Sequence, residues 1–129
     1  MVIDISALLA ILFGEPEREA FAGAIAADSK RLISAVSARE TAIVVEARKG
    51  SAGSRELDLL LHRARVSIVA FAEGQMEIAR DAWRRFGKGN HPASLNFGDC
   101  FSYALSRSSG EPLLFKGEDF SKTDVSSVL

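Results

Sequence analysis

Short apolar segments alternate with helical patterns along this chain. The strand-like segments are predicted at residues 1–4, 31–34, 66–69, 113–115 and 125–128. Helical spacing of apolar residues fills the intervals, as in the i, i+3, i+4, i+7 series that begins at Leu57. Parallel strands need such crossover helices, whereas antiparallel strands can be joined by tight turns. The alternation therefore predicts an α/β sandwich with a mainly parallel sheet.

Polar caps and glycines predict where the helices begin and end. Ser6 suits the N-cap of a helix that follows the first strand, and Ser34 or Ser37 suits the N-cap of a later one. Residues 50–53 contain two glycines and predict a break between two helices. A further helix is expected over residues 94–107, ahead of the fourth strand.

Composition limits the domain organisation and the class of protein. The 129 residues contain no repeat and no linker, so we expect a single domain over residues 1–129. A net charge of −1 excludes a uniformly basic nucleic-acid binder but leaves a local basic patch open. One cysteine cannot form an internal disulfide, and no apolar run approaches the roughly 20 residues of a membrane span. Without a signal-peptide pattern, the expected location is the cytoplasm.

Four carboxylates lie where the local pattern does not call for one. Asp4 ends the first strand and Asp119 follows the fourth, while Asp99 is in a helix that is apolar over most of its surface. Glu40 falls on a helical wheel with an apolar stripe made of Val36, Ile43, Val44 and Ala47. Each acid alone has an ordinary explanation, such as a salt bridge, a helix-dipole contact or a solvated loop. Together they suggest that the fold gathers them.

A cluster of these acids would have a chemical consequence. Two carboxylates about 4 Å apart repel by roughly 4 kcal/mol at an effective dielectric constant near 20. Such a cluster would take up protons or bind a cation, and oxygen ligands without His or Cys favour Mg²⁺ or Mn²⁺. A site of this kind can activate water and stabilise charge on a phosphodiester.

The motifs that contain these acids resemble the signature of PIN domains. The resemblance covers nearly the whole chain, and the order and spacing look most like the VapC toxins of bacterial type II toxin–antitoxin pairs. The similar segments are residues 2–8 (VIDISAL), Glu40-Thr41, residues 96–100 (NFGDC) and residues 113–120 (LLFKGEDF) with Thr123-Asp124.

The resemblance implies an α/β/α sandwich around a parallel sheet and a Mg²⁺- or Mn²⁺-dependent endoribonuclease. It also implies a small cognate antitoxin and a homodimer. It assigns the acidic metal site to Asp4, Glu40, Asp99 and Asp119, with Ser6, Asn96 and Asp124 as supporting residues.

The chain departs from the family pattern at two positions. Ile5 stands where a threonine is common, and Gly117 stands where many relatives carry another aspartate. The metal site is therefore expected to contain fewer side-chain oxygens than the sites of relatives with five acids.

A basic stretch precedes the Asp99 helix and offers a surface for RNA phosphates. The stretch contains Arg80, Arg84, Arg85, Lys88 and His91, of which Arg84, Arg85 and Lys88 are the candidate contacts. Lys116, close in sequence to Asp119, is a further candidate. The alternative for this stretch is the solvated face of an amphipathic helix. Trp83, Phe86 and Cys100 are expected in the core.

Two other functions fit parts of the pattern. A response-regulator receiver domain is also α/β, but it needs an acidic pair after the first strand and an acid after the third. Here Asp4 stands alone, and nothing acidic follows Ile68-Val69 until Glu73. A catalytically weak PIN-like binding module is the second alternative, and the gaps at Ile5 and Gly117 keep it open.

Overall fold

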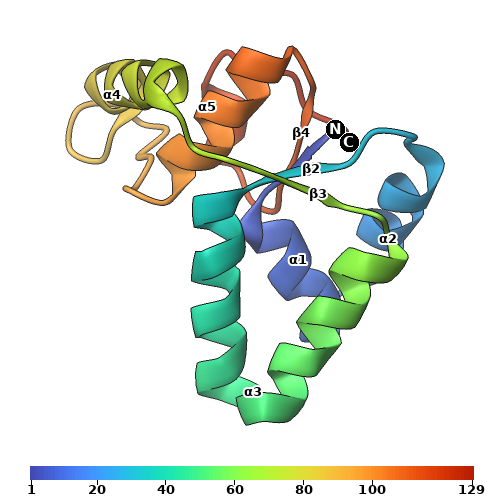
Figure 1. Ribbon diagram of the computed structural model, residues 1–129. Coiled ribbons are helices and arrows are strands. Elements are labelled where there is room, and N and C mark those ends of the chain that lie inside the picture. The colour runs from blue at the N-terminus through green and yellow to red at the C-terminus, as the bar shows by residue number, and fades with distance from the viewer.

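The computed structural model describes residues 1–129 as four short strands, five α-helices and one 3₁₀ turn (Figure 1). In chain order the elements are β1 (Val2–Ile3), α1 (Ile5–Leu12), α2 (Arg18–Ala27), β2 (Leu32–Ser34), α3 (Ala35–Arg63), β3 (Ser67–Val69), α4 (Glu73–Phe86), α5 (Asp99–Ser109), β4 (Leu113–Leu114) and η1 (Phe120–Lys122).

The four strands form one parallel sheet in the order β3-β2-β1-β4. Val2 pairs with Leu32 on one side and with Leu113 on the other, which places β1 inside the sheet. The predicted parallel sheet is confirmed. The order differs from the 2-1-3-4-5 order of receiver-type folds, so the receiver alternative is wrong.

The fifth strand predicted at residues 125–128 is wrong. Ser127 forms a single isolated bridge with Leu113, and the Val128 amide donates to the Leu113 carbonyl at 3.0 Å. Strand β4 has only two residues, so it offers the chain end too short a partner for a regular strand pair.

Two hydrophobic cores lie on opposite faces of the sheet. Side chains along a strand point alternately to its two faces, so the two residues of β1 separate. Ile3 packs in a cluster with α1, α2 and α3, whereas Val2 packs in a second cluster with α4 and α5. The sheet therefore lies between two helical layers, as expected for an α/β/α sandwich.

Helix α3 is a V whose two arms lie on either side of α1 in the view of Figure 1. Gly50 sits at the apex with φ 61° and ψ −152°, a conformation that glycine tolerates best. The break predicted at residues 50–53 is confirmed but is confined to this one residue. Ser34 caps the first arm, because its hydroxyl accepts from the Val36 amide at 3.3 Å.

Two helix starts differ from the prediction. Asp4, not Ser6, caps α1, because its carboxylate accepts from the Ser6 amide at 3.0 Å. Helix α5 begins at Asp99 rather than near residue 94. Ser94 has a positive φ of 54° and Leu95 pairs with Gly87 in a β-bridge, so both residues lie outside the helix.

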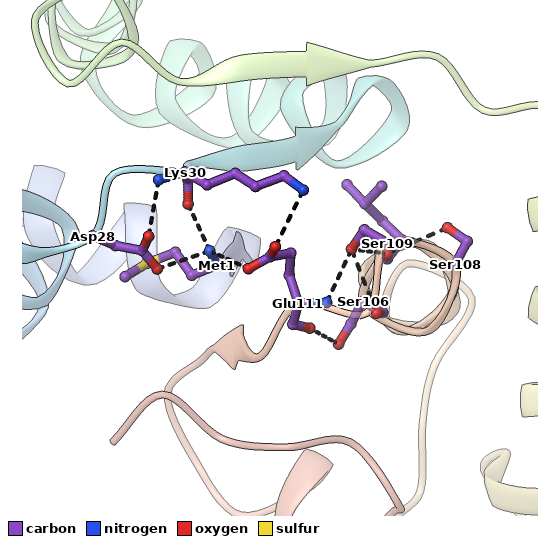
Figure 2. A network of polar contacts seen from close by, with 8 residues as sticks. Met1, Asp28, Lys30, Ser106, Ser108, Ser109 and Glu111 are labelled. Atoms are coloured by element: carbon purple, nitrogen blue, oxygen red, sulfur yellow. Dashed lines mark hydrogen bonds and ion pairs between the residues drawn. The ribbon is translucent and has the colours of Figure 1, made fainter.

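The amino-terminal edge of the sheet is held by a polar network (Figure 2). The amino group of Met1 donates to Asp28 at 2.9 Å, to the Lys30 carbonyl at 2.6 Å and to Glu111 at 3.2 Å. Lys30 also pairs with Glu111 at 3.2 Å. A buried ammonium is costly unless it is paired, and these contacts satisfy it. The opposite, carboxyl edge of the sheet carries Asp4.

None of the helices combines the length and the apolar character needed to cross a membrane.

Candidate active site

The predicted acids gather at the carboxyl edge of the sheet. Asp4 directly follows β1, and Asp119 is in the loop after the neighbouring strand β4. The chain leaves β1 toward β2 and β3 on one side, while β4 lies on the other. Ligands of open α/β sheets bind at such a switch in strand order. Glu40 comes from the first arm of α3, and Asp99 is the first residue of α5.

Asp4 is a buried carboxylate held by hydroxyl groups. Its side chain is 1% exposed. The Ser6 hydroxyl donates to one oxygen at 2.6 Å, and the Ser102 hydroxyl donates to the other at 2.6 Å. Ser102 in turn lies 3.3 Å from the Ser37 hydroxyl. These contacts fix the carboxylate in place without a positive charge beside it.

Asp99 is positioned by Asn96. The Asn96 side chain accepts from the Asp99 amide at 2.9 Å, and the Asp99 carboxylate accepts from the Asn96 amide at 2.9 Å. This reciprocal pair is the pattern of a capping box. One carboxylate therefore both stabilises the start of α5 and faces the candidate site.

Glu40 packs against a glycine. A Cβ atom added to Gly98 would lie 2.5 Å from Glu40 Oε2 and 3.1 Å from Oε1. Because residue 98 has no side chain, the Glu40 carboxylate can lie against the turn that precedes Asp99.

The prediction that Glu40 lies on the buried face of its helix, together with Ile43, is wrong. Ile43, a member of the predicted apolar stripe, is 52% exposed. The buried face of the first arm is made of Ser37, Thr41 and Val45. Glu40 lies between these two faces and is half-buried.

The four acids act on one another electrostatically. Burial raises the pKa of Asp99 to about 6, and the hydrogen bond from the Asn96 backbone opposes this only in part. The negative charges of Asp4, Asp119 and Glu40 add to the rise, in that order. Burial and then the charge of Asp4 also raise the pKa of Glu40. This edge of the sheet therefore holds a concentration of negative charge that disfavours ionisation.

The donor chemistry of the cluster fits a hard cation. None of the four acids forms an ion pair, whereas eight other acidic side chains in the chain do. All the candidate ligands are carboxylate oxygens, which suit Mg²⁺ or Mn²⁺. No group of three or more His, Cys, Asp or Glu side chains is arranged here to hold a metal ion. The oxygens of Asp4 and Asp99 face hydroxyl and amide donors instead.

Asp124 lies outside this cluster. Its carboxylate accepts from the Tyr103 hydroxyl at 2.7 Å and from Arg85 at 3.0 Å. Arg85 also pairs with Asp81 at 3.3 Å. Two candidates from the sequence, Asp124 and Arg85, are therefore bonded to each other and not to the four acids.

Among the remaining basic candidates, Lys116 forms ion pairs, whereas Arg84 and Lys88 do not. Lys116 pairs with Glu15 and, at 3.2 Å, with Glu17. Its backbone amide donates to Ser6 at 2.9 Å, which ties the loop after β4 to the start of α1. Arg84 and Lys88 are exposed and form no ion pair.

Gly117 has a φ of 96°, which explains a glycine at this position of the loop after β4. An aspartate there would adopt a strained backbone conformation.

Ser102 and Ser37 are not among the site residues predicted from the sequence. Ser102 is three residues after Asp99 on α5, and Ser37 is three residues before Glu40 on α3. Residues three apart share a helix face. The same spacing that drew attention to the acids could therefore have found both hydroxyl groups.

Comparisons with known proteins agree over nearly the full length. The family model described as PIN domain matches residues 1–126. VapC ribonuclease Mb0640 of Mycobacterium bovis is 58% identical over 128 residues, which are 99% of this chain and 98% of the relative. Ribonuclease VapC of Mycolicibacterium smegmatis is 59% identical over 128 residues, 99% of each chain.

Two solved structures share the fold. The crystal structure of Mycobacterium tuberculosis VapC20, described as a sarcin-ricin loop cleaving toxin, has a TM-score of 0.77 at 18% identity, over 96% of this chain and 95% of that one. A toxin–antitoxin complex from Klebsiella pneumoniae has a TM-score of 0.73 at 14% identity, over 95% and 92%.

Proposed function

This chain belongs to the PIN domain family, and from that premise we propose that it is an RNA-cleaving toxin of the VapC type, neutralised by an antitoxin. The observation that carries the proposal is that Asp4, Glu40 and Asp119 lie near enough to Asp99 for their charges to raise its pKa, while none of the four acids has a cation partner. Relatives that are 58% and 59% identical bear ribonuclease names, which supports the same activity for this chain.

The activity depends on Mg²⁺ or Mn²⁺ in this proposal. Asp4, Asp99 and Asp119 would hold the ion, and Glu40 would either join them or orient water. When bound, the ion would activate a water molecule and offset the charge that develops on the phosphodiester.

The residues around the acids have positioning roles. Ser6 and Ser102 hold Asp4 from two sides, and Asn96 holds Asp99 at the start of α5. The raised pKa of Glu40 brings this carboxylate closer to the pH at which it could accept a proton from water.

Protein partners are a second part of the proposal. The complex from Klebsiella pneumoniae supports an antitoxin partner for this fold. We also expect a homodimer in the cytoplasm. Ile68 on the edge strand β3 and Ile43 on α3 are 58% and 52% exposed and are candidates for this contact.

Cleavage of RNA by the purified chain tests the proposal. We expect cleavage with Mg²⁺ or Mn²⁺ and none in EDTA. Asp4→Asn should abolish cleavage, because the amide cannot carry the negative charge that a cation needs. Asp58→Asn is the matched control, since Asp58 is exposed on α3 and forms no ion pair.

Two outcomes would contradict this assignment. The first is an Asp4→Asn protein that cuts RNA as fast as the original chain. The second is metal binding without any EDTA-sensitive cleavage, which would support a binding module. In cells, expression should arrest growth, and Asp99→Ala should relieve the arrest.

A further inference from the structure

An apolar groove opens beside the acidic site. It lies between α4 and the start of α5 and has a volume of about 530 Å³, within the range of small-molecule sites. The groove has four aromatic rings and two guanidinium groups among its lining residues: Phe71, Trp83, Phe97, Phe101, Arg80 and Arg84. No acidic residue lines it.

Two of these rings are unusually open to solvent. Phe97 is 76% exposed and Trp83 is 42% exposed, so the expected core position of Trp83 is wrong. Phe86, three residues later on α4, is 8% exposed and is a core residue as predicted. Phe97 is held edge-on to Phe101, with ring centroids 4.9 Å apart. Phe97 also lines the groove, so its exposed surface is available there.

The arginine beside these rings has no partner in the chain. Arg84 forms no hydrogen bond or ion pair, while Arg85 next to it is bonded to Asp81 and Asp124. Arg80 has only one long contact, at 3.5 Å, with exposed Glu77. The groove thus combines flat apolar walls with available positive charge.

The groove and the acidic site share the start of α5. Phe97 lies between Asn96, which holds Asp99, and Gly98, which packs against Glu40. Cys100 and Phe101, directly after Asp99, line the groove. Residues that line the groove therefore flank Asp99 in sequence and adjoin Gly98, which contacts the Glu40 carboxylate.

We propose that this groove is a nucleobase-binding subsite for single-stranded RNA, in which a base contacts Trp83 and Phe97 while Arg84 binds a neighbouring phosphate. The inference rests on the proposed ribonuclease function, and it specifies which part of the surface would hold the RNA strand. Aromatic rings bind bases through their faces, and arginine binds the backbone phosphates.

RNA suits the groove better than an acidic or apolar protein segment. The four acids repel a polyanion, so a strand at the site needs cations and uncharged contacts close by. The groove supplies both, and its lining includes Phe97 and Cys100 on either side of Asp99 in sequence. Among the basic candidates from the sequence, Arg85 and Lys116 already have carboxylate partners, whereas Arg84, which lines the groove, has none.

Trp83 itself provides the assay, because it is the only tryptophan in the chain. Its fluorescence is measured during titration with a short single-stranded 2′-O-methyl oligoadenylate, which resists cleavage, in EDTA. We expect quenching by this probe and little quenching by an abasic oligonucleotide of equal length. Phe97→Ala should weaken binding about 5- to 150-fold, the range for loss of one stacked base. Arg84→Gln should weaken binding and reduce its salt dependence.

Leu59→Ala is the control variant. Leu59 is 49% exposed but lines a different pocket, so this change should leave the titration unaltered. Equal quenching by the abasic probe, or equal affinity of the Phe97→Ala protein, overturns the proposal. It is also overturned if Trp83 emission shifts with protein concentration and Phe97→Ala abolishes a dimer in sedimentation, because a second copy then covers the groove.

RNA cleavage by the same preparation is measured separately. A chain that cleaves RNA but shows no base-dependent quenching contradicts the subsite alone. A chain that does not cleave contradicts the proposed function, while the quenching result still decides whether the groove binds bases.

Discussion

Asp99→Asn should stabilise the folded chain at neutral pH while removing its activity. The ionised carboxylate is held in a partly buried place among three other negative charges, and this raises its pKa from 3.8 to about 6. An asparagine keeps an oxygen that can accept from the Asn96 amide, so the start of α5 retains its hydrogen bond. The substitution therefore removes a charge without removing the cap.

The expected size follows from the pKa. A rise of about two units corresponds to a cost of roughly 3 kcal/mol for the ionised form, because one unit is about 1.36 kcal/mol. Asp99 is partly exposed, so solvent screening reduces this to about 1–2 kcal/mol. The folded state binds the proton more tightly than the unfolded state, so the cost is absent below about pH 4 and complete above about pH 6.

Urea unfolding of both proteins in EDTA, from about pH 4 to about pH 8, measures this effect. The stability of the original chain should fall relative to that of Asp99→Asn as the pH rises from about 4 to about 6, and the difference should then stay level. Titrating groups outside the four acids are common to both proteins and cancel in the difference. Glu46→Gln, which removes an exposed acid from α3, should show no such pH-dependent gain.

The reasoning is refuted if Asp99→Asn is no more stable than the original chain at pH 8, or if the difference does not change with pH. Either result would mean that burial and the neighbouring carboxylates do not disfavour ionisation of Asp99. Added Mg²⁺ should stabilise the original chain and leave Asp99→Asn nearly unchanged, which links the same carboxylates to the proposed metal site.

Three further predictions concern the surroundings of the site. Asp4→Ala should cost about 1–3 kcal/mol in thermal unfolding, because it removes the N-cap of α1 and leaves buried hydroxyl groups without an acceptor, and Asp4→Asn should cost less. An Asp4→Ala protein as stable as the original would contradict this. Gly98→Ala should displace the Glu40 carboxylate and reduce RNA cleavage by about 10²-fold, with a change in stability under about 1 kcal/mol, since the clash is with the end of a flexible side chain. Unchanged cleavage would show that the position of Glu40 is not needed. Glu111→Gln should lower the unfolding midpoint by weakening the network around the Met1 amino group, and RNA cleavage should remain normal at temperatures where the chain is folded.

The parallel sheet and the approximate place of the site could be predicted from the sequence. Asp4 and Asp119 follow short apolar segments, and in a parallel sheet the ends of such segments meet at one edge. Asp99 stands out because it interrupts an apolar helix. These inferences need only strand and helix patterns, which local sequence carries.

The environment of Glu40 could not be predicted in the same way. Apolar periodicity selects Val36 and Ile43, but the buried face of α3 contains Ser37 and Thr41. Small hydroxyl residues pack closely and satisfy their own polar groups, as Thr41 does by donating to the Ser37 carbonyl at 2.7 Å. A pattern that counts apolar residues misses a face of this kind.

The openness of Trp83 also depends on long-range packing. Its spacing on α4 is that of a core residue, yet the turn that carries Phe97 leaves a groove there in place of a filled core. Sequence spacing gives the direction of a side chain around its own helix, but it cannot show whether another element covers it.

The double use of Asp4 has a consequence for how this chain could lose its toxicity by mutation. Positions 40, 98 and 119 can change with little effect on folding, so inactivating alleles at these positions would yield intact protein. At position 4 the same side chain caps α1 and accepts from Ser6 and Ser102, so most replacements would also lower the amount of folded chain. In a selection for survivors of toxin expression, full-length protein at normal abundance should therefore be common among Gly98 mutants. Among Asp4 mutants it should be rare, except for asparagine.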